Sequence, residues 1–128
     1  MEKITWKIAT FYELSNDELF DVFVLRTAIF VVEQDCPYQE VDETDKIAFH
    51  VLGIINKELV AVARIVPPSQ PNNEVKIGRV AVRKAFRRQK IADKMMEECF
   101  RFIEQQWKNQ PIAISAQQYL IDFYANHN

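Results

Sequence analysis

A strand–turn–helix–strand pattern in the second half of the sequence constrains the fold more than any other feature. Val75 to Val82 reads as a strand, and a basic turn follows over residues 83–90. From Ile91 to about Trp107, apolar residues recur at helical spacing. Pro111 stops this helix before a short buried strand at Ile112–Ala116. Strand, helix and strand in this order predict a parallel right-handed crossover, and therefore a layered α/β sheet.

The first half of the sequence predicts one further strand and one further helix. Residues 3–9 alternate apolar and polar side chains, which is typical of a strand. Ser15 and Glu18 have the spacing of a capping box, which predicts the start of a helix. Its apolar face comprises Leu19, Phe20, Val22, Phe23, Leu25 and Ile29. The acidic segment 33–47 is irregular, and we expect a loop with at most a helical turn.

The middle of the chain predicts a pair of strands, Phe49–Ile55 and Leu59–Val66, joined by a tight turn at Asn56-Lys57. Residues 67–73 are rich in proline and asparagine, so we expect neither strand nor helix there but a surface loop. Together with Val75–Val82, the pair should form an antiparallel meander. A last helix is predicted at Tyr119–Ala125.

Size and composition restrict the class of protein. The 128 residues are enough for a single domain, which we expect to span 1–128. A net charge of −2 argues against a nucleic-acid binder, and no apolar run could cross a membrane. Cys36 and Cys99 lack metal-ligand spacing, so we expect no metal. With no export signal in the sequence, two isolated cysteines predict a cytoplasmic protein.

The basic turn is the strongest candidate for a binding site. Helix N-termini present free amides and a partial positive charge, and Arg87, Arg88 and Lys90 add cations there. Such a site suits a diphosphate, although a solvated basic turn without a ligand is the alternative. Only Gly53 and Gly78 occur in the whole chain, which excludes a glycine-rich phosphate loop.

The turn and several other segments resemble a known family. Arg87-x-x-Lys90-x-Ala92, after a strand and opening a helix, is similar to the Arg/Gln-x-x-Gly-x-Gly/Ala signature of the GNAT superfamily of acyl-CoA N-acyltransferases. Within it, the chain resembles the ElaA-like group. The residues that carry this are Arg26, Phe30–Asp42, His50, Gly53 and Ile77–Val82. The resemblance implies a mixed, mostly antiparallel sheet with helices on both faces. Lys90 stands where the general signature has glycine.

The resemblance also implies a function, transfer of an acetyl group from acetyl-CoA, used as cosubstrate, to the amine of a small molecule or peptide. Acetyl-CoA should lie between the fourth and fifth strands, where they splay apart. The cofactor-binding residues implied are Val80, Ala81, Val82, Arg87, Arg88, Gln89, Lys90, Ile91, Ala92 and Gln117. Among them, main-chain groups of Val80 and Val82 would meet the pantetheine arm and thioester.

Three catalytic candidates follow from the same resemblance. Tyr124 matches a tyrosine that protonates the departing thiolate, and its alternative is a packed aromatic beside Phe123. The fourth strand has no carboxylate, so Glu33 and His50 remain as candidate general bases. His50 could instead be a hydrogen-bonded histidine at a strand start. Glu33 could instead pair with Arg26 or shape the acceptor pocket.

Two other features leave alternatives open. The acidic loop would favour a cationic acceptor, or is a plain solvated surface. Relatives continue beyond the tyrosine with two more strands, whereas this sequence stops at Asn128. We therefore expect a chain truncated at its C-terminus, with an exposed sheet edge covered by self-association or a partner. An impaired or non-catalytic CoA-binding regulatory module is the alternative function, and a small RNA-binding domain is disfavoured by the net charge.

Overall fold

A computed structural model describes residues 3–69 and 73–114, which form a five-stranded sheet in the order β1-β2-β3-β4-β5. The strands are β1 (Thr5–Thr10), β2 (Phe49–Ile55), β3 (Glu58–Ser69), β4 (Glu74–Val82) and β5 (Ile112–Ile114). The pairs from β1 to β4 are antiparallel, and β5 is parallel to β4. The mixed, mostly antiparallel sheet, the meander and the parallel crossover are thus confirmed.

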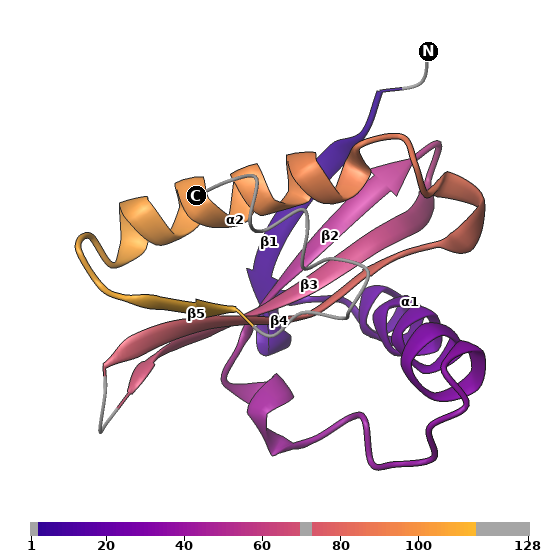
Figure 1. The fold of residues 1–128 in the computed structure, drawn as a ribbon, viewed down its shortest axis with the longest axis horizontal. Coiled ribbons are helices and arrows are strands. Elements are labelled where there is room, and N and C mark those ends of the chain that lie inside the picture. Colours follow the sequence, from indigo (N-terminus) through magenta and orange to yellow (C-terminus); the bar gives the residue numbers. More distant parts are fainter. Residues whose placement is uncertain (1–2, 70–72, 115–128) are drawn as a thin grey trace.

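The two main helices, α1 (Asn16–Arg26) and α2 (Ile91–Gln106), cover opposite faces of the sheet (Figure 1). Met95, Met96 and Cys99 of α2 pack on one face of the central strands, and Val22 and Leu25 of α1 pack on the other. Residues 59–65 of β3 are buried throughout, because this strand lies between both helical layers. No helix in the described ranges is long and apolar enough to cross a membrane.

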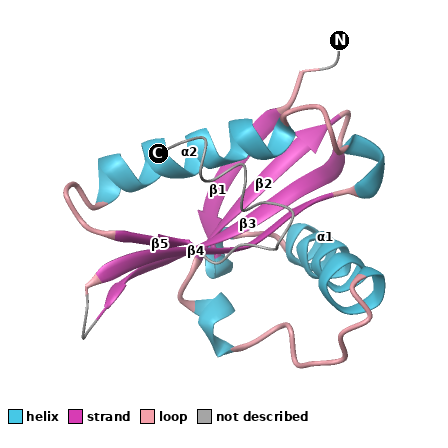
Figure 2. Cartoon of the chain, in the orientation of Figure 1, coloured by secondary structure: helices cyan, strands magenta, loops and turns pink. Residues whose placement is uncertain are grey.

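The start of α1 follows the predicted capping box. The Glu18 amide donates to Ser15 Oγ at 3.0 Å, and the Ser15 amide donates to Glu18 Oε1 at 2.8 Å. The helix continues as a π-helical segment, Thr27–Glu33, before the long loop to β2, which has one helical turn at Glu43–Lys46 (Figure 2). Phe20 was predicted on the apolar face of this helix, but it is 67% exposed and does not contribute to the core.

The strand boundaries also correct two expectations. β3 runs through Pro67 and Pro68 to Ser69, where only a loop was expected. The register with β4 shifts between Val66 and Ser69, because prolines cannot donate to the ladder there. β5 was expected to be buried, yet Ile112 is 39% exposed and the other two residues are half-buried.

The turn between β2 and β3 and the contact at Gly53 fix the sheet locally. Asn56 and Lys57 both have positive φ, 50° and 67°, as a two-residue hairpin turn requires. Gly53 pairs with Trp6 on β1, and a Cβ added at Gly53 would lie 2.6 Å from the indole ring. A side chain at position 53 would therefore displace Trp6 from its place on the core.

Candidate functional site

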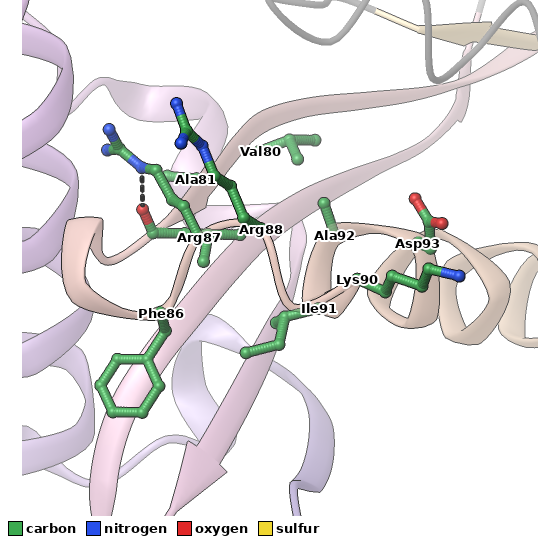
Figure 3. Close-up of a pocket in the computed structure, with 10 residues that line it drawn as sticks. Val80, Ala81, Phe86, Arg87, Arg88, Lys90, Ile91, Ala92 and Asp93 are labelled. Atoms are coloured by element: carbon green, nitrogen blue, oxygen red, sulfur yellow. Dashed lines mark hydrogen bonds between the residues drawn. The ribbon is translucent and has the colours of Figure 1, made fainter.

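A pocket of about 540 Å³ lies where β4 gives way to α2 (Figure 3). Its walls come from the last residues of β4, the turn and the first turn of α2. The lining residues are Val80, Ala81, Val82, Phe86, Arg87, Arg88, Lys90, Ile91, Ala92 and Asp93. Among the cofactor-binding residues predicted within the described ranges, only Gln89 does not line this pocket. Phe86 and Asp93 were missed, because the family resemblance implied no role for either residue.

The backbone of the turn concentrates hydrogen-bond donors beside the pocket. Arg88 and Lys90 have left-handed backbones, with φ of 68° and 62°, and Lys90 is the N-cap of α2. The first amides of a helix have no partner within the helix, and the helix dipole adds partial positive charge. Lys90 adopts the conformation that glycine accepts most readily, which accounts for glycine at this place in the general signature.

Next to these amides, no described strand pairs with the outer edge of β4. Within the described ranges, β5 pairs with β4 only at Val75, Lys76 and Ile77. The Arg83 amide donates to the Val60 carbonyl of β3, so alternation along the strand turns the main chain of Val82 away from β3. The Val82 carbonyl indeed accepts from Arg87 Nε at 2.8 Å. By the same alternation, the main-chain groups of Val80 point toward this edge.

The three cations that line the pocket differ in their surroundings. Arg88 and Lys90 are exposed, and neither forms an ion pair with another described residue. Arg87 donates to the Val82 carbonyl, which is the dashed line in Figure 3, and its Nη1 and Nη2 contact the Glu33 carboxylate at 2.7 and 2.9 Å. Arg88 and Lys90 therefore remain available for an anion, whereas Arg87 is engaged by its neighbours.

Glu33 ends the π-helical segment and lies against the turn. Its partner is Arg87, so the suggested pairing of Glu33 with Arg26 is wrong. The hydrogen bonds from Arg87 hold the pKa of Glu33 below its usual range. A carboxylate so stabilised in its ionised form is a weak proton acceptor.

His50 lies on β2 and does not line the pocket. The ring is 1% exposed, and Nε2 lies 2.8 Å from the Asp45 carbonyl oxygen, to which it can only donate. Burial lowers the pKa of His50, and the nearby Arg26 and Arg64 lower it further, although Asp45 acts in the opposite direction. These contacts support the alternative of a hydrogen-bonded histidine at a strand start.

A network of three arginines and three carboxylates joins the acidic loop to α1, β3 and β4. Arg26 Nε contacts Glu40 at 2.9 Å and Arg26 Nη1 contacts Asp45 at 2.8 Å, with all three side chains buried. Arg64 contacts Asp42 and Asp45, and Arg79 contacts Glu40 and Asp42. The sequence interpretation missed this network because its charges lie far apart along the chain. Glu40 and Asp45 are therefore not solvated surface, and arginines neutralise their charge.

The two cysteines differ in exposure, and the remaining site candidates lie outside the described residues. Cys99 is buried in the core, and burial raises the pKa of its thiol to about 12. Cys36 is exposed. Gln117, Tyr124 and the predicted helix Tyr119–Ala125 lie outside the described residues.

The sequence and the fold were compared with known proteins. The family model described as "Acetyltransferase (GNAT) family" matches residues 8–128. Protein ElaA of Escherichia coli (strain K12) is 39% identical over 123 residues, which cover 94% of this chain and 80% of ElaA.

Solved structures give the same relationship. The crystal structure of Escherichia coli ElaA superposes with a TM-score of 0.93 at 38% identity, covering 98% of this chain and 86% of that one. An acyl-CoA N-acyltransferase from Pseudomonas aeruginosa gives 0.91 at 34% identity, covering 98% and 85%. A predicted acetyltransferase from Clostridium acetobutylicum, solved with acetyl-CoA, gives 0.69 over 98% and 89% of the chains. At 14% identity, this last likeness shows the fold alone.

Proposed function

The chain belongs to the ElaA-like group of the GNAT acetyltransferase family, and from this premise we propose that it transfers an acetyl group from acetyl-CoA to the amine of an acceptor. The observation that carries the proposal is the start of α2, where free amides, Arg88 and Lys90 lie beside a strand edge that no described strand covers. The Clostridium acetobutylicum protein of the same fold was crystallised with acetyl-CoA, which supports this choice of ligand.

The pocket residues fit the two chemically different ends of acetyl-CoA. The diphosphate would lie at the N-terminus of α2, where amides, the helix dipole and the cations of Arg88 and Lys90 favour negative charge. The pantetheine arm is a chain of amides and methylenes. It would extend along β4, where Val80 and Val82 offer main-chain groups between apolar side chains.

The reaction needs three things from the protein: a base for the amine proton, a donor to the negative charge that develops on the thioester oxygen, and a proton for the departing sulfur. The acceptor nitrogen attacks the thioester carbon, the carbon–sulfur bond breaks, the amine loses a proton and the sulfur gains one. The Val80 amide would donate to the thioester oxygen as negative charge develops on it. Tyr124 would protonate the sulfur and Gln117 would contact the pantetheine arm. These two assignments follow from the resemblance and stay predictions.

The general base is a separate question, because Glu33 and His50 both have other contacts. Glu33 is held by Arg87, and His50 is buried against Asp45. The role of either residue as the general base stays a prediction. The contacts of both residues support a structural role. We therefore assign the binding of acetyl-CoA, and not the removal of the amine proton, to the residues of the pocket.

The binding site is tested by a charge reversal. Acetyl-CoA at about 100 times its dissociation constant should stabilise the wild-type protein by about 2.7 kcal/mol and raise its melting temperature. Arg88→Glu combined with Lys90→Glu should abolish this thermal shift, because like charges then face the diphosphate. Lys3→Glu combined with Lys108→Glu makes the same change in net charge at exposed sites outside the pocket, and should keep the shift. A full shift in the first variant would rule out this site.

A further inference from the structure

Arg79 lies at an irregularity in β4 that precedes the pocket. Val62 pairs with Ala81 and Arg64 with Gly78, so Ala63 of β3 faces two residues of β4, Arg79 and Val80. This is a β-bulge, and Arg79 has the left-handed backbone, with φ of 52°. The bulge separates the part of β4 that pairs with β5 from the part that lines the pocket.

The residue type at this bulge is unexpected. A left-handed conformation costs free energy for any residue with a Cβ, and glycine is the usual solution. Gly78 is adjacent, yet no glycine of the described chain has a positive φ. Some interaction of the Arg79 side chain must therefore offset the cost.

The acidic loop supplies that interaction. Arg79 Nε lies 2.7 Å from Glu40 Oε2, and Nη2 donates to the Glu40 carbonyl oxygen at 2.7 Å. Asp42 adds a weaker contact at 3.4 Å, and the guanidinium lies 6.0 Å from the centre of the Tyr38 ring. Glu40 is itself fixed, since it is 3% exposed and its carboxylate accepts a hydrogen bond from Arg26 Nε.

We propose that Arg79 is a positioning residue: Glu40 holds its guanidinium, which keeps residue 79 left-handed and so maintains the bulge that aims the main chain of Val80 and Val82 into the pocket. The proposal rests on the proposed function, because it assigns those main-chain groups to the thioester end of acetyl-CoA. The acidic loop thereby shapes the cofactor site.

A positioning role and a purely structural role of Arg79 predict different effects for glycine at position 79. If Arg79 only ties the acidic loop down, then alanine and glycine at position 79 remove the same contacts and have the same effect. If Arg79 maintains the bulge, alanine keeps the unfavourable left-handed backbone without its compensation, whereas glycine adopts that backbone at little cost.

The experiment compares Arg79→Ala and Arg79→Gly by calorimetric titration with two ligands. Acetyl-CoA should reach the bulge with its pantetheine arm. The nucleotide 3′-phosphoadenosine 5′-diphosphate has the phosphates but no pantetheine arm, so it should bind only at the turn before α2. Arg79→Ala should raise the dissociation constant of acetyl-CoA about fivefold or more, because the binding-competent bulge is less populated. The dissociation constant of 3′-phosphoadenosine 5′-diphosphate should change less than twofold. Arg79→Gly should restore acetyl-CoA binding to within about twofold of wild type.

Three outcomes would overturn the inference. They are equal losses in the alanine and glycine variants, a matching loss for both ligands, and unchanged acetyl-CoA binding in Arg79→Ala. Arg79→Lys keeps a cation beside Glu40 and should lie between wild type and alanine, which provides a milder variant if alanine unfolds. A wild-type protein that does not bind acetyl-CoA would overturn the proposed function and this inference together, whereas the three outcomes above leave the function intact.

Discussion

Three residues that line the pocket or lie beside it have a left-handed backbone. Arg79, Arg88 and Lys90 all have positive φ, and none of them is glycine. The contact with Glu40 offsets the cost of the left-handed backbone at Arg79. Lys90 is exposed and has no ion pair within the described ranges. The Lys90 backbone therefore holds strain that its side chain does not offset in the unliganded protein.

Lys90→Gly should stabilise the unliganded protein. A left-handed non-glycine residue costs about 1–2 kcal/mol, and glycine costs about 0.5–1 kcal/mol through the entropy of the unfolded chain. The net expectation is an increase of roughly 0.5–1 kcal/mol in the free energy of unfolding, measured by urea denaturation. The matched control is Gln89→Gly, at an exposed neighbour without positive φ, which should destabilise. Loss of stability in both variants would contradict the argument.

The contact between Glu33 and Arg87 joins two elements that are distant in the sequence. Glu33 ends the π-helical segment after α1, and Arg87 belongs to the turn before α2. The geometry is bidentate, at 2.7 and 2.9 Å, but the side chains are 38% and 26% exposed. Solvent therefore screens the pair, and we expect it to orient the turn without contributing much stability.

A double-mutant cycle measures the interaction between Glu33 and Arg87. Glu33→Gln, Arg87→Gln and the double variant should give a coupling free energy of about 0.2–1 kcal/mol, as for other exposed ion pairs. The coupling should shrink as salt is raised from about 0.01 to 1 M, because the Debye length falls from about 30 to 3 Å. A coupling that is larger and independent of salt would mean that the pair is effectively buried.

At the scale of the whole molecule, the buried ionisable groups in and beside the acidic loop link folding to pH. Burial opposes the ionised form of Asp45, but hydrogen bonds from Arg26 and Arg64 outweigh it and hold the pKa below its usual range. His50 is buried nearby with its own pKa lowered. For both groups the unfolded chain binds protons more readily than the folded protein, so acid favours unfolding.

Stability should fall first through His50. Its contribution is complete above the unfolded pKa of about 6.5 and is lost as the pH falls toward the lower folded pKa. The free energy of unfolding should thus be smaller at pH 5.5 than at pH 7.5, by at most about 1.4 kcal/mol per pH unit for one group. Denaturant unfolding at the two pH values measures it. His50→Gln should flatten this dependence, and an unchanged slope in that variant would assign it to other groups.

The candidate site was predictable as far as it is local in sequence. The end of β4 and the turn from Arg87 to Ala92 are close in the sequence, so the family resemblance predicted nearly all the described residues that line the pocket. The partners of Glu33 and Arg79 were not predictable, because they lie 54 and 39 residues away and no periodicity marks them. The bulge escaped prediction for the same reason, since neighbouring strands create it.

The sequence by itself determined the order of elements, the hairpin at Asn56-Lys57 and the capping box at Ser15, because propensity, capping and periodicity act over a few residues. Only the tertiary structure decided which charges meet. Arg26, Arg64 and Arg79 lie on three different elements, and the acidic loop brings the buried side chains of Glu40 and Asp45 among them. An isolated buried charge is too costly to remain unpaired, so the packing of the whole sheet, and not any local pattern, selects its partner.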